Sequence, residues 1–93
     1  MDVETALREI DEANSKHVGS ETYERQREEY EQTLREVNRI GDAETVEELT
    51  KWICAFIRDE EERPSIGRVD KQASDRLEAA GYDVPLESHL DPA

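Results

Sequence analysis

The chain has 93 residues, of which 40% are charged and 34% are hydrophobic, and its formal net charge is −13. This length predicts a single domain over residues 1–93, without room for a second core. No run approaches the roughly 18 apolar residues of a membrane span, and the acidic N-terminus lacks the basic-then-apolar form of a signal peptide. We therefore expect no membrane partner and a location in the cytoplasm, or in a viral particle assembled there.

The charge balance is typical of proteins that work in concentrated salt. The chain holds 25 acidic residues against 12 basic ones, and a surface rich in carboxylates repels itself unless ions screen it. In this bias the chain resembles haloarchaeal proteins, which implies a halophilic source and a fold that loosens at low salt. High charge with few aromatics is also typical of disorder, but the apolar residues recur at helical spacings, which predicts a folded chain.

Two amphipathic segments predict an antiparallel helical hairpin at the start of the chain. Val3, Leu7 and Ile10 recur at three- and four-residue steps and predict a helix over about residues 3–16. A second helix is predicted over residues 20–40, where apolar residues form a seam narrower than the usual face of a globular helix. We expect this seam to contact another subunit. Its members are Tyr23, Tyr30, Leu34 and Val37.

The residues that flank these segments predict where the second and third helices begin and end. Ser20 is a predicted N-cap for the second helix, since its hydroxyl would accept a hydrogen bond from an unpaired amide of the first turn. Gly41 is a predicted left-handed stop, and Asp42 is a predicted N-cap for a third helix over residues 43–58. We expect the third helix to end near Arg58, because the acidic run that follows opposes the helix dipole.

The third helix holds the widest apolar arc in the chain. Burying one large apolar side chain is worth roughly 1.5–3 kcal/mol, so we expect this helix to be the hydrophobic centre. Replacing Trp52 or Phe56 with alanine should therefore unfold the domain. The arc consists of Val46, Leu49, Trp52, Ile53, Phe56 and Ile57.

A fourth helix is predicted over residues 66–80, with Ser65 as its N-cap. Gly81 predicts a left-handed C-terminal stop of the Schellman type, in which the following Tyr82 folds back onto the helix. Two prolines disfavour helix in the tail over residues 83–93, so we expect it to be extended. Its apolar side chains would need a groove on this chain or on a neighbour. They are Val84, Leu86 and Leu90. The predicted fold is thus an all-α, four-helix domain with a C-terminal tail.

Residues that would carry catalysis or bind a cofactor are scarce. The four glycines are scattered and form no phosphate-binding loop, and neither His17 nor His89 has a partner at a metal-ligand spacing. Cys54 lies in the most apolar predicted helix, where burial raises the pKa of a thiol and lowers its reactivity. We expect no cofactor, no metal and no enzymatic activity. The alternative of a small ligand binder would need a pocket that gathers Tyr23, Tyr30, Trp52 or Cys54.

Nucleic-acid binding is the main alternative function. Positive charge exceeds negative charge only around the fourth helix, so a basic face over residues 65–80 would meet phosphates. The third and fourth helices loosely resemble a helix-turn-helix, although their acidic connection is longer than the usual tight turn. DNA binding also weakens as salt rises. The basic residues are Arg63, Arg68, Lys71 and Arg76.

The leading hypothesis is a structural or adaptor protein that acts through protein–protein assembly or self-association. The supply of core-forming side chains is thin for this length, and we expect contact with another protein to complete the core. In length, helical pattern and thin core the chain resembles the small helical adaptor and connector proteins of tailed viruses, here from an archaeal halophile. The resemblance covers the general plan of the chain and carries over no functional residue. A third alternative is an antitoxin-like regulator that binds a single protein.

Overall fold

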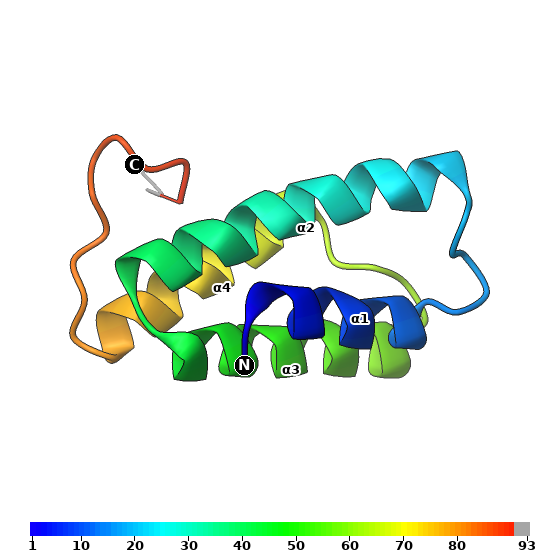
Figure 1. Ribbon diagram of the computed structural model, residues 1–93, viewed down its shortest axis with the longest axis horizontal. Helices are drawn as coiled ribbons and strands as arrows, with labels where there is room; N and C mark the ends of the chain where they lie inside the picture. Colours follow the sequence, from blue (N-terminus) through cyan, green and yellow to red (C-terminus); the bar gives the residue numbers. More distant parts are fainter. Residues whose placement is uncertain (91–93) are drawn as a thin grey trace.

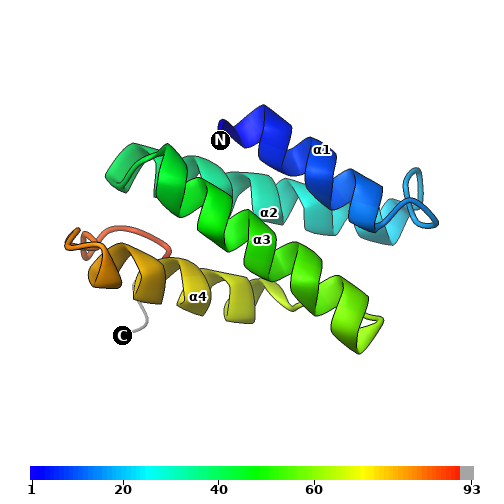
Figure 2. The same ribbon diagram turned by 90° about the horizontal axis from the view of Figure 1, so that it is seen from below.

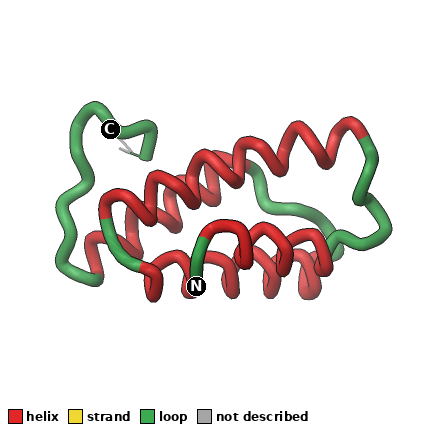
Figure 3. Tube along the Cα trace, in the orientation of Figure 1, coloured by secondary structure: helices red, strands yellow, loops and turns green. Residues whose placement is uncertain are grey.

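The computed structural model describes residues 1–90 and contains four helices in that range, with no strand. Successive helices run in opposite directions (Figure 1), and short connections join them (Figure 3). The predicted all-α, four-helix fold is confirmed. The helices are α1 (Val3–Ala13), α2 (Glu21–Ile40), α3 (Ala43–Glu60) and α4 (Ile66–Ala79).

Helices α2 and α3 form the centre of the bundle. Figure 2 shows α1 and α4 on opposite sides of α3, and each of these outer helices packs against both α2 and α3. The radius of gyration is 12.5 Å, close to the value of about 12 Å expected for a compact domain of this length. The arrangement leaves an outward surface on each of the four helices as a candidate contact face.

The predicted N-caps are confirmed. Ser20, Asp42 and Ser65 each have extended backbone, and each side chain accepts a hydrogen bond from the amide three residues ahead. Asp2 caps α1 in the same way, at 2.7 Å from the amide of Thr5. These side chains fix the start of every helix because they satisfy amides that have no partner within the helix.

The predicted stop at Gly81 is also confirmed. Gly81 has a φ of 93° and its amide donates to the carbonyl of Glu78 at 3.0 Å. The amide of Tyr82 donates to the carbonyl of Leu77 at 2.9 Å. These two bonds are the pair that defines a Schellman motif.

The left-handed stop predicted at Gly41 is wrong, and the glycine serves a different purpose. Its φ is −111°, which lies outside the left-handed region. A Cβ atom at this position would lie 2.6 Å from Cδ2 of Leu77 and 3.3 Å from the carbonyl oxygen of Val37. Glycine is needed here because α4 approaches the α2–α3 connection too closely for a side chain.

Helix α1 ends at Ala13, three residues before the predicted residue 16, and α3 ends two residues beyond the predicted Arg58. The helix continues to Glu60, and Glu61 adopts the left-handed conformation with a φ of 57° while its amide donates to the carbonyl of Ile57. Exposed charges at a helix end interact with the dipole by only about 0.3–1 kcal/mol each and are screened by salt. The acidic run therefore fails to outweigh the continued backbone hydrogen bonding.

The core is built from all four helices and is closed by the chain itself. Tyr23, Tyr30 and Leu34 are among the largest fully buried side chains. The expectation that another protein must complete this core is therefore wrong. The buried hydrophobic residues are Val3, Ala6, Leu7, Ile10, Tyr23, Tyr30, Leu34, Val37, Val46, Leu49, Ile53, Val69, Ala73, Leu77 and Leu90.

The wide apolar arc of α3 divides between the core and the surface. Val46, Leu49 and Ile53 are fully buried, whereas Trp52 and Phe56 remain partly exposed. Trp52 packs against the rim of the core, and Phe56 is not among the residues that do so. The expectation that both aromatic side chains form the hydrophobic centre is wrong, because α4 covers only part of that side of α3.

The tail folds back toward α2 instead of extending away (Figure 1). Leu90 is 1% exposed and Val84 packs against the core, so both find their groove on this chain. Leu86, in contrast, is 85% exposed. A turn closed by the amide of Ser88 and the carbonyl of Pro85, 3.0 Å apart, replaces the predicted extended conformation. The remaining part of the predicted tail, residues 91–93, lies outside the described residues.

Candidate functional site

The seam predicted as an interface lies inside the protein. Tyr23, Tyr30, Leu34 and Val37 are all fully buried, so none is available to a partner while the fold is intact. The physical reason is that α2 is a central helix, covered by its three neighbours. Sequence alone did not reveal this, because a narrow seam is as typical of a small buried core as of a subunit contact.

The two tyrosine hydroxyls in that seam have partners within the chain. Tyr30 donates to the carbonyl of Pro64 at 2.6 Å, and Tyr23 donates to Asp11 Oδ1 at 2.6 Å. Burial raises the pKa of both tyrosines, and the hydrogen bond to Asp11 raises that of Tyr23 further. Both phenols therefore remain protonated donors that tie α1 and the α3–α4 connection to α2.

Asp11 is also the acceptor of a two-pronged ion pair with Arg27. Arg27 Nε lies 2.8 Å from Asp11 Oδ1, and the terminal guanidinium nitrogen lies 3.1 Å from Oδ2. Partial burial alone would raise the pKa of Asp11, but the hydrogen bonds from Arg27 and Tyr23 lower it overall. The cluster joins α1 to α2 and has no open position for a substrate.

The predicted nucleic-acid residues do not converge on one surface. Arg63 donates to Gln26, and its guanidinium lies 5.3 Å from the centre of the Tyr23 ring. Lys71 pairs with Asp75 at 3.3 Å. These contacts direct the two side chains to different neighbours. Arg68 and Arg76 each approach an aromatic ring of α3, Arg68 at Phe56 and Arg76 across a groove from Trp52.

An aromatic pair lies beside those two arginines. The ring centres of Trp52 and Phe56 are 5.5 Å apart with a tilt of 42°. The Arg68 guanidinium lies 5.7 Å from the centre of the Phe56 ring, within the range of a cation–π contact. We call Trp52, Phe56, Arg68 and Arg76 the aromatic edge.

The aromatic edge borders a shallow groove of about 850 Å³ between α3 and the end of α4. Trp52 and Arg76 line it from opposite sides, with Glu48 and Ala80 among their neighbours. Arg76 donates to Gln72 Oε1 at 2.9 Å, while its Nε has no hydrogen-bond partner among the described residues although that atom is buried. A buried donor without a partner is uncommon and costs stability.

The aromatic edge was missed at the sequence level because both rings were assigned to the core. The signal was present in the helical spacing. Trp52 lies about 100° around α3 from Ile53, which places it at the border of the apolar arc. A neighbouring helix that packs on the centre of the apolar arc therefore leaves Trp52 partly uncovered.

Other surface features are isolated or have no ligand-like geometry. Leu86 and Val18, the latter 54% exposed, lie in separate loops. Burial raises the pKa of the Cys54 thiol, with Glu9 and Glu12 adding to the effect. His89 lies beside Glu36, 3.6 Å from its carboxylate, whereas His17 lies in the α1–α2 turn. Within residues 1–90, no three His, Cys, Asp or Glu side chains are grouped closely enough to hold a metal ion.

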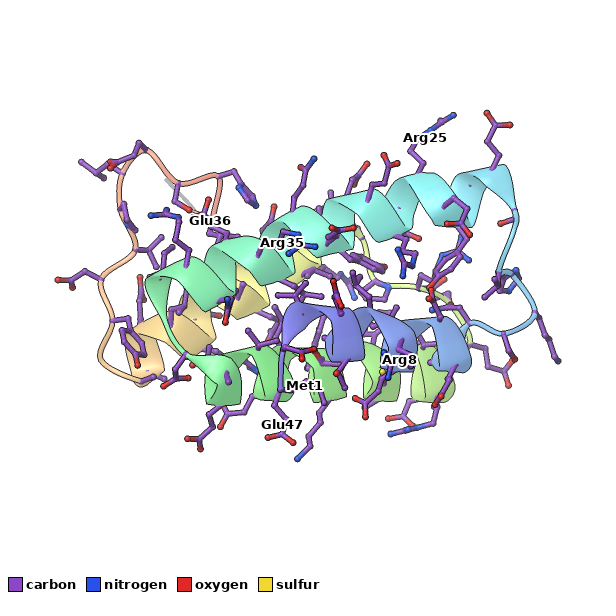
Figure 4. All side chains as sticks on the ribbon, in the orientation of Figure 1. Met1, Arg8, Arg25, Arg35, Glu36 and Glu47 are labelled. Carbon is purple, nitrogen blue, oxygen red and sulfur yellow. The ribbon has the colours of Figure 1, made fainter. Side chains whose placement is uncertain are left out.

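Charged side chains cover the remaining surface. Figure 4 shows side chains such as the labelled Arg25 and Glu47 directed away from the bundle, while apolar side chains fill the space between helices. None of the described helices combines the length and apolar character that crossing a membrane requires. No protein-family model, curated protein or solved structure matches the chain.

Proposed function

We propose that the chain is a non-enzymatic structural or adaptor protein that binds another protein through the aromatic edge. The observation that carries this proposal is the position of the aromatic pair. The chain has one tryptophan and one phenylalanine, and both are left partly exposed, whereas Tyr23 and Tyr30 are fully buried.

The energetics of burial support this reading of the aromatic pair. A phenylalanine or tryptophan buries about 150–250 Å² when it is fully covered, so exposure forgoes part of the roughly 1.5–3 kcal/mol that burial provides. A chain with 34% hydrophobic residues has few such side chains to spare. Contact with a partner would recover the lost burial.

The composition of the aromatic edge also supports a protein contact. Tryptophan and arginine are enriched among the residues that dominate binding energy at interfaces, and here they are adjacent. We further propose that the protein works in concentrated salt, in a halophile's cytoplasm or in a viral particle assembled there. Apolar contacts would persist in such a medium, whereas exposed ion pairs are screened.

Site-specific photocrosslinking in the cells that produce the protein would test this function. A photoreactive phenylalanine analogue replaces Phe56, and the matched control carries it at Val18, which is exposed in the α1–α2 turn. The proposal predicts a discrete protein adduct from position 56 and none from position 18. Adducts from neither position, or equally from both, would refute it.

Binding to nucleic acid through α4 is the second candidate, and one observation favours it. Arg68 is exposed and Arg76 is half-exposed two turns further along α4, and neither forms an ion pair within the described residues, so both would be free to meet phosphates. The test is fluorescence anisotropy with duplex DNA in high salt. Binding that is lost in the Arg68→Glu, Arg76→Glu variant, with helicity unchanged, would support it, and no binding by the wild-type chain would end it.

The mass of the crosslinked product separates the remaining candidates. A single defined partner of another size would support an antitoxin-like regulator, whereas a product that contains several components would support an adaptor in an assembly. Both outcomes leave the aromatic edge as the contact surface.

A further inference from the structure

The C-terminal tail is fastened to the bundle by the residues around His89. Leu90 and Ser88 are both buried, and the amide of Leu90 donates to Ser88 Oγ at 3.1 Å. Between them, His89 lies beside side chains of both α2 and α4. The tail, which approaches α2 in Figure 1, therefore crosses the seam between these two helices at His89.

The two nitrogens of the His89 ring face different carboxylates. Nδ1 lies 3.6 Å from Glu36 Oε2 on α2, and Nε2 lies 3.8 Å from Asp70 Oδ1 on α4. Nε2 also lies 3.4 Å from Thr33 Oγ1. Figure 4 shows the labelled Glu36 on the part of α2 that the tail approaches. A single ring thus joins the tail to both helices.

The hydrogen-bonding groups around the ring are all acceptors. The hydroxyl of Thr33 donates its one proton to Asp70 Oδ1 at 2.6 Å, so toward His89 it can only accept. Ionised carboxylates also only accept. Each ring nitrogen therefore needs a proton of its own to attract its neighbour. A neutral imidazole carries one N–H and the imidazolium carries two, so only the charged ring suits every group around it.

Two arginines of α2 border the hollow beside His89, and both are paired with glutamates of the same helix. Arg39 pairs with Glu36 through Oε1, which leaves Oε2 to His89. Arg35 pairs with Glu31 at 2.7 Å. Because each arginine is offset by a glutamate, α2 adds no excess positive charge around the ring.

The groups on α4 and in the tail make the surroundings of the ring negative. Among the described residues, His89 is the one cationic side chain within 4 Å of the Asp70 carboxylate, since the adjacent Lys71 pairs with Asp75 at 3.3 Å. In the tail, the exposed Glu87 lies two residues before His89. This excess of negative charge attracts the charged ring more strongly than the neutral one.

We propose that His89 is a pH-operated clasp that holds the tail across α2 and α4 when its ring is charged. Histidine changes charge between about pH 5 and pH 8. The clasp is present below this range and is lost as the pH rises through it, because one ring nitrogen then turns a lone pair toward a carboxylate. Opening frees Leu90 and uncovers the α2–α4 seam. The clasp lies apart from the aromatic edge, so its test is separate from that of the proposed function.

The strength of the clasp follows from how exposed its members are. The side chain of His89 is 44% exposed, whereas those of Glu36 and Asp70 are 17% and 23% exposed. Ion pairs with an exposed member are weak individually and are screened by salt. Two of them at one ring should therefore change the closing equilibrium of the tail about three- to tenfold.

Amide hydrogen exchange at about pH 5 and about pH 8 tests the clasp. The measured quantity is the protection factor of the Ser88 and Leu90 amides, which is the exchange rate of a free peptide divided by the measured rate. This ratio removes the direct effect of pH on exchange and reports how often the tail opens. In the lowest salt that keeps the chain helical, wild-type protection should be about three- to tenfold higher at the acidic pH. Concentrated salt should reduce the difference.

Three substitutions identify the source of the pH effect. His89→Gln keeps a polar side chain that does not titrate, so its protection should agree at the two pH values to within about twofold. His17→Gln is the matched control, because His17 lies in the α1–α2 turn, and it should keep the wild-type difference. Asp70→Asn removes one of the two carboxylates and should reduce the difference at least about twofold.

Equal wild-type protection at the two pH values would overturn the inference, as would greater protection at the basic pH. A pH effect that survives in His89→Gln, or that disappears in His17→Gln, would also overturn it. The amide of Leu34 in α2 reports on the whole fold, and its protection should stay the same at both pH values. A parallel change at Leu34 would show that the entire protein loosens, and would refute a clasp confined to the tail.

Discussion

Replacing Gly41 with alanine should destabilise the protein, although glycine-to-alanine changes outside left-handed positions usually have the opposite effect. The φ of Gly41 is −111°, so the penalty of the left-handed region does not apply, and the stiffer unfolded chain would stabilise the fold by about 0.4–1 kcal/mol. Against this, the new Cβ atom would lie 2.6 Å from Cδ2 of Leu77. Leu77 is fully buried and has no free space to move into.

The magnitude follows from these two opposing effects. Forcing an extra carbon into a packed core costs about 1–3 kcal/mol, so the net loss for Gly41→Ala should be about 1–2 kcal/mol. For a domain of this size, that corresponds to a fall in melting temperature of roughly 4–15 °C. The loss should appear without a change in helix content, because the cap at Asp42 is untouched.

A double-mutant cycle with Leu77→Ala identifies the cause. Leu77→Ala alone should cost about 2–5 kcal/mol. In that background the clashing atom is gone, so the additional cost of Gly41→Ala should fall to about 0.5 kcal/mol or less. Chemical unfolding of the four chains provides the free energies. The reasoning is refuted if Gly41→Ala is as stable as wild type, or if its cost is the same in both backgrounds.

Three further predictions concern buried contacts and the tail. Tyr30→Phe should lower the free energy of unfolding by about 0.5–1.5 kcal/mol, because the carbonyl of Pro64 loses the shorter of its two hydrogen bonds and keeps the one from Gln26; an unchanged value in urea unfolding would contradict this. The pKa of Asp11 is lower in the folded protein than its ordinary value of 3.8. Its contribution to the free energy of unfolding is therefore present above pH 3.8 and is lost as the pH falls through the lowered folded-state pKa. Asp11→Asn should flatten the dependence of this free energy on pH in acid, and an unaltered slope would contradict the prediction. Leu90→Ala should speed amide exchange in the tail, since Leu90 anchors it, whereas Leu86→Ala should not; equal effects would show that the tail is not anchored there.

The sequence predicted the helices well because their signals are local. Ser20, Asp42 and Ser65 each precede an amphipathic segment, and a side-chain oxygen at that position satisfies the amides of the first turn whatever the rest of the chain does. The glycine at position 81 likewise ended α4 as predicted. These signals depend on a few neighbouring residues, and for this reason they could be interpreted without the tertiary structure.

The division between core and surface could not be predicted in the same way. Tyr23 and Tyr30 belong to a narrow seam, yet they fill the centre because α2 has neighbours on three sides. Trp52 and Phe56 belong to the widest arc, yet they reach the surface because α4 covers only part of it. Helical periodicity gives the direction of each side chain but not the position of the neighbouring helix.

Gly41 shows a related limit. A glycine between two helices is needed either for its backbone conformation or for the space that a side chain would occupy, and sequence does not distinguish these. The predicted left-handed conformation was the more common choice at a helix end. Only the approach of Leu77, which is 36 residues away along the chain, reveals that space is the reason.

The central claim is that the core is closed without the Phe56 ring, which leaves the aromatic edge available to a partner. The most direct test compares the free energies of unfolding of Phe56→Ala and Ile53→Ala in the same buffer. Ile53 is fully buried, so its variant should lose about 2–5 kcal/mol, while Phe56→Ala should lose less than about 1.5 kcal/mol because that ring is partly exposed and is not packed against the core. A loss in Phe56→Ala as large as that in Ile53→Ala would show that the ring belongs to the core, and would contradict the claim.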